Sequence, residues 1–159
     1  RFDDADNDLV RIEGKVREAG GEIIQLTGQV TDGDGNPVSG ARVEIWQCDA
    51  NGRYLHTGDN RNTPRDNGFQ GFGHHVTGKD GSYRFRTIRP VPYPGRTPHI
   101  HVKVFADKRT LTTQLYLADE LGNQRDSLYR RLSAVERQAV EMRFEKWDGV
   151  PTTTVNLVI

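Results

Sequence analysis

The sequence has little sulfur and no long hydrophobic run, and both absences exclude classes of protein. Its single cysteine, Cys48, cannot form a disulfide within the chain, which excludes a disulfide-stabilised scaffold. Cys48 lies in a run flanked by apolar residues, which predicts a packed thiol rather than a nucleophile. No apolar run approaches the roughly 18 residues that a membrane-spanning helix requires, so we expect a soluble chain.

An excess of charge of one sign is also lacking. The chain of 159 residues has 22 Lys and Arg against 22 Asp and Glu, so its formal net charge is zero. This balance gives no field that would indicate nucleic acid or an anionic membrane as a partner, and a small-molecule site is the better expectation. The length predicts one domain with its own core.

Methionine is nearly absent as well, since Met142 is the only one and the chain begins with Arg1. A removed leader, a tag junction or a truncated chain would each explain this start. The compartment therefore stays open between the cytoplasm and a mature secreted chain whose leader has been removed.

Short β-rich runs dominate the sequence after a polar amino-terminal segment. Residues 1–21 are polar and end in two glycines, which predicts an arm rather than core, and residues 22–159 are then the catalytic or binding domain. Runs separated by Gly, Pro, Asn and Asp turns predict a mainly β fold, an antiparallel β-sandwich with long loops. The runs are "EIIQLTGQVT", "ARVEIWQC", "GSYRFRTI", "HIHVKVF", "LTTQLYL" and "TTTVNLVI".

One segment in the carboxy-terminal half favours a short helix. In "SAVERQAVEMRFE", Ser133 is followed by Glu136 in a capping-box pattern, and Val135, Ala139 and Met142 recur at helical spacing. The stretch from His56 to Gly73 is too polar for core and predicts a long surface loop, where sites on a rigid sandwich tend to lie.

Two histidines two residues apart are the first indication of chemistry. Side chains alternate across a strand, so His99 and His101 in "HIHVKV" are expected on one face and Ile100 and Val102 on the other. Two imidazoles on one face can share a metal ion, and Pro98 stiffens the entry into the strand.

Further ligands have to come from other residue types. No Asp or Glu lies at strand spacing to complete a two-histidine, one-carboxylate triad, and no cysteine pair suits zinc. Tyr93, six residues before His99, and Tyr54, at the start of the long loop, are candidates. A phenolate needs a strongly Lewis-acidic ion to deprotonate it, and ferric iron meets that requirement better than zinc or calcium.

The remaining histidines and the tryptophans suggest no second site. His74 and His75 point to opposite faces if the run is extended, and with His56 they are expected in loops or at the rim, His56 being a candidate for substrate contact. Trp46 and Trp147 are expected in the core.

Several of these motifs together resemble the intradiol ring-cleavage dioxygenases, the non-haem ferric enzymes related to protocatechuate and catechol dioxygenases. The similarity covers about Glu22 to Tyr116 and is carried by the following stretches: "LTGQVTDGDGNPVSGARVEIWQCDANGRY", "GFQGFGHHVTGKDGSYRFRTIRPVPYPGRTPHIHVKV" and "TTQLY".

The resemblance implies a complete site. Two tyrosines and two histidines hold Fe(III) in that family, and they correspond here to Tyr54, Tyr93, His99 and His101. The family's active-site arginine and glutamine correspond to Arg96 and Gln114, and Tyr93 to the tyrosine that leaves the metal when substrate binds. The implied partners are a small aromatic diol and O2, and a homo-oligomer is compatible with the pattern.

The implied reaction is insertion of O2 into a catechol-type diol, with cleavage between the two hydroxyl-bearing carbons to give a muconate-type diacid. The link from Tyr93 to His99 is shorter than in the protocatechuate and catechol enzymes, and Gly95 stands where an aromatic residue is often found. This departure suggests a more open pocket, for catechol, hydroxyquinol or larger lignin-like diols.

A binding module is the alternative. The stretches "GQVTDGDGNPVSGARVEI" and "TGKDGSYRF" are also typical of transthyretin-like and carboxypeptidase regulatory-like sandwiches, which are not catalytic. Tyr54, the stretch "YPGRTPHIH" and Gln114 distinguish the two, because a structural sandwich has no reason to assemble them. A hydrolase is disfavoured because no nucleophile elbow is present.

Overall fold

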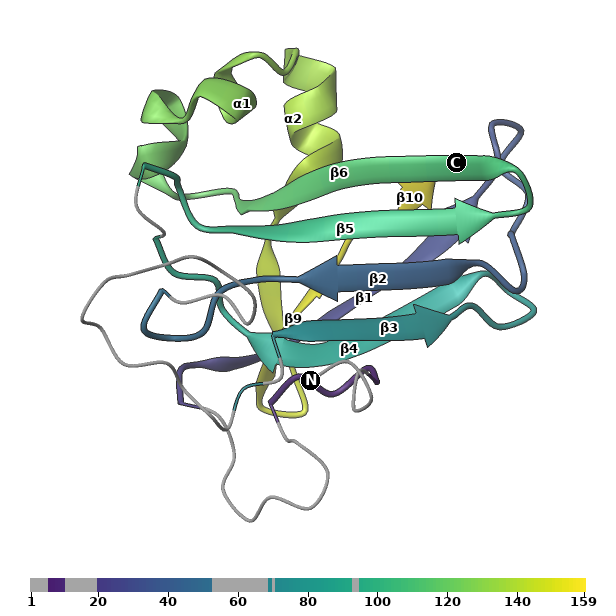
Figure 1. Ribbon diagram of the computed structural model, residues 1–159, viewed down its shortest axis with the longest axis horizontal. Helices are drawn as coiled ribbons and strands as arrows, with labels where there is room; N and C mark the ends of the chain where they lie inside the picture. The colour runs from purple at the N-terminus through teal and green to yellow at the C-terminus, as the bar shows by residue number, and fades with distance from the viewer. Residues whose placement is uncertain (1–5, 11–19, 53–68, 70, 93–94) are drawn as a thin grey trace.

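Two β-sheets pack against each other in a sandwich (Figure 1). The computed structural model describes residues 6–10, 20–52, 69, 71–92 and 95–159. In this part of the chain, one sheet has the order β10-β1-β9-β8 with β4 also paired to β1, and the other has the order β3-β2-β5-β6-β7. The strands are β1 (Ile23–Thr31), β2 (Arg42–Trp46), β3 (Phe72–Val76), β4 (Ser82–Ile88), β5 (His99–Ala106), β6 (Arg109–Leu117), β7 (Glu141–Met142), β8 (Phe144–Trp147), β9 (Val150–Thr154) and β10 (Leu157–Val158).

The core lies between the two sheets and follows the alternation of the strands. On β5, Ile100, Val102 and Val104 are buried against the other sheet, and Leu26 of β1 and Phe85 of β4 pack against them as part of one hydrophobic cluster. The prediction of a mainly β sandwich is confirmed. Most strand pairs are antiparallel, whereas β1 pairs in parallel with β9 and β10, and β6 with β7.

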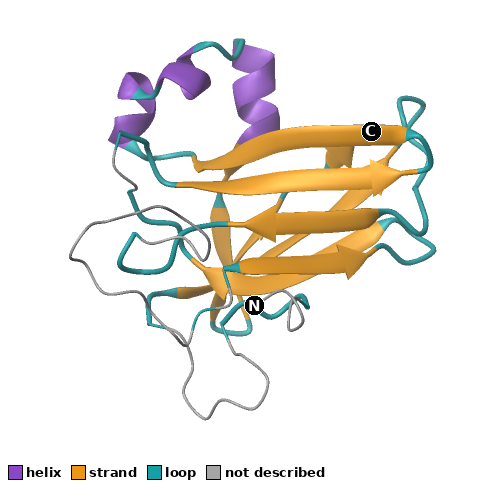
Figure 2. Cartoon of the chain, in the orientation of Figure 1, coloured by secondary structure: helices purple, strands orange, loops and turns teal. Residues whose placement is uncertain are grey.

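A short helical segment lies at the β6 edge of the second sheet (Figure 2). It comprises the 3-10 helix η1 (Leu121–Arg125), α1 (Ser127–Arg130) and α2 (Ala134–Val140). The predicted capping box is confirmed, because the Ser133 side chain accepts from the Glu136 backbone N–H and the Glu136 side chain accepts from the Ser133 N–H.

The prediction that Val135 and Met142 lie on one apolar face of this helix is wrong. Val135 is 78% exposed, and the helix ends at Val140 so that Met142 lies in β7. Met142 is buried there beside Leu117 of β6, because pairing with a sheet edge satisfies its backbone and covers its side chain together.

Part of the amino-terminal segment belongs to the core. Leu9 and Val10 are fully buried, the Leu9 backbone N–H donates to the Arg86 carbonyl, and Asp8 pairs with Arg86 at 3.1 Å. The expectation of an arm outside the core is therefore wrong for these residues, because Leu9 and Val10 belong to the hydrophobic cluster between the sheets. The domain boundary after residue 21 stays a prediction.

The predicted long loop ends earlier than expected. Phe69 is buried and β3 begins at Phe72, while residues 53–68 and 70 lie outside the described residues. His74 and His75 lie within β3 rather than in a loop, on opposite faces as their spacing predicts. His75 faces β4, where its Nδ1 accepts the Arg84 backbone N–H at 2.9 Å and its ring meets that of Phe85 edge-on.

Two further predictions concern single side chains. Cys48 is a packed thiol, 2% exposed, as predicted. Trp147 is not core: it is 73% exposed and lines an open groove on the outer face of the first sheet with residues such as Arg84 and Thr152. In the described residues, no helix is long and apolar enough to cross a membrane.

Candidate metal centre

Strand β5 carries the two predicted histidine ligands on the outer face of its sheet. His99 and His101 alternate with the inward-facing Ile100 and Val102, as predicted. Their Nε2 atoms lie 3.1 Å apart. At this separation only one hydrogen fits between the two nitrogens, and the distance also suits two neighbouring ligands of one ion at metal–nitrogen bonds of about 2.0–2.1 Å.

Both imidazoles are held in the neutral form that can bind a metal. Burial lowers the pKa of His99 and outweighs the hydrogen bond to Thr97, which raises it, while the Arg96 charge adds a smaller lowering. Burial, the neighbouring His99 and Arg96 lower the pKa of His101 to about 4. At neutral pH, each ring therefore carries one N–H and keeps a lone pair on its other nitrogen.

Each ring is oriented by a contact at its other nitrogen or its face. The Nδ1 of His99 lies 2.8 Å from the Thr97 carbonyl, and since a carbonyl only accepts, this nitrogen carries the proton and Nε2 carries the lone pair. Trp46 stacks on His101 with ring centroids 4.9 Å apart and an interplanar angle of 3°. Trp46 is half-buried on the outer face and directly opposite His101 in the β2–β5 register, so it supports the site rather than filling the core as predicted.

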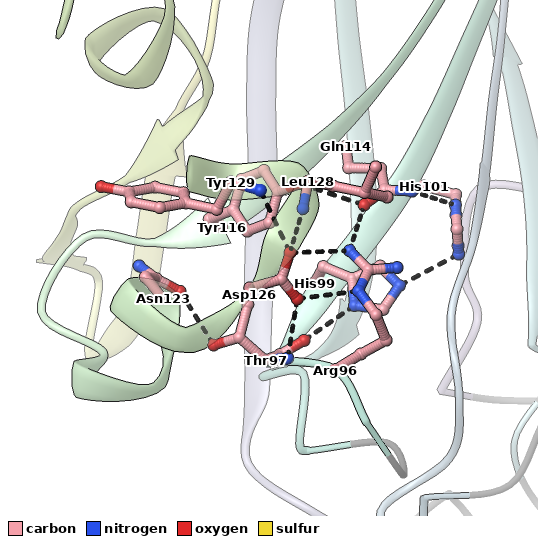
Figure 3. A network of polar contacts seen from close by, with 10 residues as sticks. All are labelled: Arg96, Thr97, His99, His101, Gln114, Tyr116, Asn123, Asp126, Leu128 and Tyr129. Atoms are coloured by element: carbon pink, nitrogen blue, oxygen red, sulfur yellow. Dashed lines mark hydrogen bonds and ion pairs between the residues drawn. The ribbon is translucent and has the colours of Figure 1, made fainter. Parts of the chain in front are cut away.

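Arg96 and Gln114, which the family resemblance implied as site residues, meet beside the histidines (Figure 3). Gln114 is the register partner of His101 on β6, and its Nε2 lies 3.4 Å from the His101 Nδ1. Its Oε1 accepts from the Arg96 Nη2 at 2.6 Å and from the Tyr116 hydroxyl at 3.1 Å. A guanidinium can only donate, so it fixes which end of the Gln114 amide faces the histidine.

Asp126 is the member of this network that the sequence did not reveal. Its Oδ2 accepts from the Arg96 Nε at 2.7 Å, and its side chain has no exposed surface. Asp126 also caps α1, where its side chain accepts the N–H groups of Leu128 and Tyr129. An Asp directly before a helix is a recognisable cap signal, but its pairing with a residue 30 positions earlier leaves no local pattern.

The donor set fits a metal that also takes oxygen ligands from elsewhere. Among the described residues, no cluster of three or more His, Cys, Asp and Glu side chains could hold an ion. The histidine pair therefore needs partners of another type or from another segment. Tyr54 and Tyr93, the two predicted partners, and His56 lie outside the described residues.

Comparison with known proteins decides the family. A family model described as a dioxygenase matches residues 2–145, which is most of the chain. The chain belongs to the intradiol ring-cleavage dioxygenase family. The family match extends beyond the stretch that carried the resemblance in the sequence and includes the buried Leu9 and Val10.

Individual members of the family agree with this assignment. The protocatechuate 3,4-dioxygenase beta chain of Burkholderia cepacia is 37% identical over 148 residues, covering 87% of this chain and 63% of its own length. The hydroxyquinol 1,2-dioxygenase of Nocardioides simplex is 36% identical over 131 residues, covering 70% of this chain and 42% of its own. This intradiol dioxygenase chain thus spans less than two thirds of the length of either relative.

A solved structure shares both sequence and fold. The dioxygenase domain of a dioxygenase and carbohydrate-binding protein fusion from Streptomyces sp. SirexAA-E has a TM-score of 0.76 at 33% identity, covering 98% of this chain and 87% of that one. The alternative of a transthyretin-like binding module is not favoured, because the relatives are dioxygenases.

Proposed function

We propose that this chain is an Fe(III)-dependent intradiol dioxygenase that inserts O2 into a catechol-type aromatic diol. The diol would be cleaved between its two hydroxyl-bearing carbons to give a muconate-type diacid. The observation that carries the proposal is the pair of Nε2 atoms 3.1 Å apart, on neutral imidazoles, with the Arg96 guanidinium and Gln114 on the same face.

The proposed ligands are Tyr54, Tyr93, His99 and His101. Two phenolates and two neutral imidazoles suit a hard, highly charged ion, and iron dependence is general in this family. Bound Fe(III) would supply the Lewis acid that takes up both diol oxygens and makes the ring reactive toward O2. The residues of this chain then have to bind and orient the diol and remove its protons.

Tyr93 is the proposed acceptor of one substrate proton. A diol that binds through both oxygens as a dianion has to lose two protons, and a displaced Tyr93 phenolate would be basic enough to take one. Gly95 and Arg96 follow closely in sequence, so the proposed proton acceptor and the proposed anion-stabilising group come from one connection between β4 and β5.

Arg96 is proposed to stabilise negative charge that develops on the ring. Its charge is permanent, and its side chain is 22% exposed, so the surrounding protein screens it less than bulk water would. Gln114 would hold the guanidinium in place through the 2.6 Å hydrogen bond to Nη2. Orientation before the reaction matters because preorganised donors cost no rearrangement in the transition state.

The substrate class is proposed only as a catechol-type diol. Relatives are named for protocatechuate, hydroxyquinol and catechol, which share two adjacent ring hydroxyls and differ in their other substituents. One relative is named as a beta chain, which supports assembly with further chains, and a homo-oligomer is the form we propose here.

The first test is a visible absorption spectrum with iron analysis of the purified protein, before and after anaerobic addition of catechol. Tyrosinate bound to ferric iron absorbs broadly in the visible, and the band should move to longer wavelength when catechol binds. Admission of air should then yield a muconate-type product. A protein that stays colourless after loading with ferric iron would contradict the ligand set.

A matched variant separates the histidine site from adventitious iron. The double variant His99→Ala, His101→Ala should neither hold iron nor shift its spectrum with catechol. Colour that persists in this variant would show that the iron is bound elsewhere.

A further inference from the structure

Asp126 is a buried carboxylate whose two oxygens accept from four groups. Oδ2 accepts from the Arg96 Nε at 2.7 Å and from the Thr97 backbone N–H at 3.1 Å. Oδ1 accepts from the backbone N–H groups of Leu128 and Tyr129, each at 3.1 Å. The side chain has no exposed surface, so its position is fixed from all sides (Figure 3).

The guanidinium of Arg96 is held at two of its three nitrogens. Nε is bound by Asp126, and Nη2 lies between the Gln114 Oε1 at 2.6 Å and the Asp126 Oδ1 at 3.5 Å. Because the guanidinium is planar, fixing Nε and Nη2 also fixes the direction of the Nη1 donors.

The same carboxylate connects Arg96 to the metal-binding strand. The Thr97 N–H is bound by Asp126, and the Thr97 carbonyl orients His99 through Nδ1. The Thr97 hydroxyl also donates to the Asn123 Oδ1 at 2.8 Å. The stretch that bears Arg96 is thus fixed against η1 and α1, which contact β6 through the Asn123 amide on the Leu117 carbonyl and the Tyr129 ring on Tyr116.

We propose that Asp126 is a positioning residue that aims the Arg96 guanidinium at the bound diol, an inference that rests on the proposed function. Asp126 does not touch the substrate. It neutralises a partly buried cation and removes the freedom of the guanidinium to turn toward solvent. A side chain held only by Gln114 would sample several orientations, and misplacement of a reacting or stabilising group by about 1 Å can cost roughly 100-fold in rate.

The ionisation of Asp126 agrees with this role. Burial opposes its charged form, but the hydrogen bond from Arg96 and the N–H groups of Tyr129 and Thr97 outweigh it, so its pKa lies below the ordinary value. The carboxylate is therefore charged at any pH at which the enzyme would be assayed.

Asp126→Asn is the variant that tests positioning with least damage to folding. Asparagine is as good a helix cap as aspartate, so one oxygen still accepts the Leu128 and Tyr129 N–H groups. The other oxygen is replaced by an NH2 group, which repels the Arg96 Nε–H and the Thr97 backbone N–H. The matched control is Asp32→Asn, a turn carboxylate that also accepts backbone N–H groups, from Asp34 and Asn36, and is remote from the site.

The kinetic experiment is a double-mutant cycle on the iron-loaded protein with catechol. We expect Asp126→Asn to keep the iron content and the anaerobic catechol spectrum, and to slow the reaction with O2 by about 10- to 100-fold. On an Arg96→Gln background, the same substitution should change the rate by less than about twofold, since the group that it positions is gone. Equal losses on both backgrounds, or full activity of Asp126→Asn, would overturn the proposal.

A second measurement does not depend on activity. In the metal-free protein, the Arg96 Nε–H should give a slowly exchanging NMR signal that is absent from Arg96→Lys. This signal should disappear in Asp126→Asn and persist in Asp32→Asn. If the signal survives in Asp126→Asn, the positioning role is overturned. If the iron-loaded wild type is inactive, the proposed function is overturned, and the NMR comparison still decides whether Asp126 holds Arg96.

Discussion

Trp46 and His101, opposite each other on β2 and β5, stack with their rings within 3° of parallel. The stacked indole covers one face of His101 while His99 meets it edge-on, with centroids 4.6 Å apart. His101 is thus held from two directions, and its Nε2 is directed at the Nε2 of His99. Precise placement of two nitrogens by strand pairing is the feature on which the proposed metal site depends.

Removal of either histidine should abolish specific iron binding. We expect His99→Ala and His101→Ala each to lower iron affinity by more than about 100-fold. Loss of a residue that only orients a metal ligand costs up to about 100-fold, and loss of the ligand itself should cost more. Iron content after dialysis and the visible band are the measurements. His74→Ala, on β3 of the same sheet, is the control and should bind iron like wild type, and a loss in the control would point to general damage of the sheet.

Removal of the stacked ring should weaken the site without destroying it. Trp46→Leu should lower iron affinity by about 10-fold, since His101 keeps its strand position but loses support at its face. Trp46→Phe should retain most of the affinity because a flat ring remains. Trp147→Leu alters an exposed tryptophan of the other sheet and should have no effect. Competition with a coloured chelator measures all three, and equal affinity of Trp46→Leu and wild type would refute the supporting role.

Tyr83 should contribute to stability and not to iron binding. Its hydroxyl donates to the Val155 carbonyl at 2.6 Å in the core, and burial raises its pKa. Tyr83→Phe leaves that buried carbonyl without this partner, at a cost of about 1–3 kcal/mol in the free energy of unfolding. Urea unfolding measures the loss. An unchanged unfolding free energy would mean that the carbonyl finds another donor.

His75 should make the stability of the metal-free protein depend on pH. Burial, followed by the nearby His74, lowers the pKa of His75, and its Nδ1 must stay unprotonated to accept the Arg84 N–H. The unfolded chain therefore binds a proton more readily than the folded one. This stabilising contribution is complete above the unfolded pKa of about 6.5 and is lost as the pH falls through the lower folded value.

The measurement is urea unfolding at about pH 7.5 and about pH 5.5, on either side of the unfolded pKa. His75→Asn keeps an acceptor but cannot titrate, so it should lose less unfolding free energy between the two pH values than wild type does. An identical loss in both proteins would show that other groups carry the pH dependence.

Local patterns predicted much of the fold and the placement of two of the four proposed metal ligands. The common face of His99 and His101 followed from strand alternation alone, and the capping box of Ser133 and Glu136 from local spacing. Predictions that depended on the length of a pattern were less accurate. The helical spacing continued to Met142, but a backbone at that point gains more from pairing with β6 than from another helical turn.

Burial of single side chains was the least predictable property. Leu9 and Val10 are core residues within a polar stretch, whereas Trp147 is exposed despite its apolar ring. The reason is that burial depends on which surfaces the chain folds against, and these are formed by residues far away in sequence. Trp46 illustrates the same point, since its ring stacks on His101, which is 55 positions later in the sequence and lies opposite Trp46 where β2 pairs with β5.

The sequence by itself determined the sandwich class, the shared face of the two histidines and, through resemblance, the selection of Arg96 and Gln114. These follow from periodicity, turn chemistry and motifs, which are local along the chain. Only the tertiary structure decided that Asp126 holds Arg96, that Trp46 stacks on His101 and that Gln114 lies between the guanidinium and His101. Such pairings depend on sheet register and on the packing of the helical segment beside β6, and neither of these is encoded in any single stretch of residues.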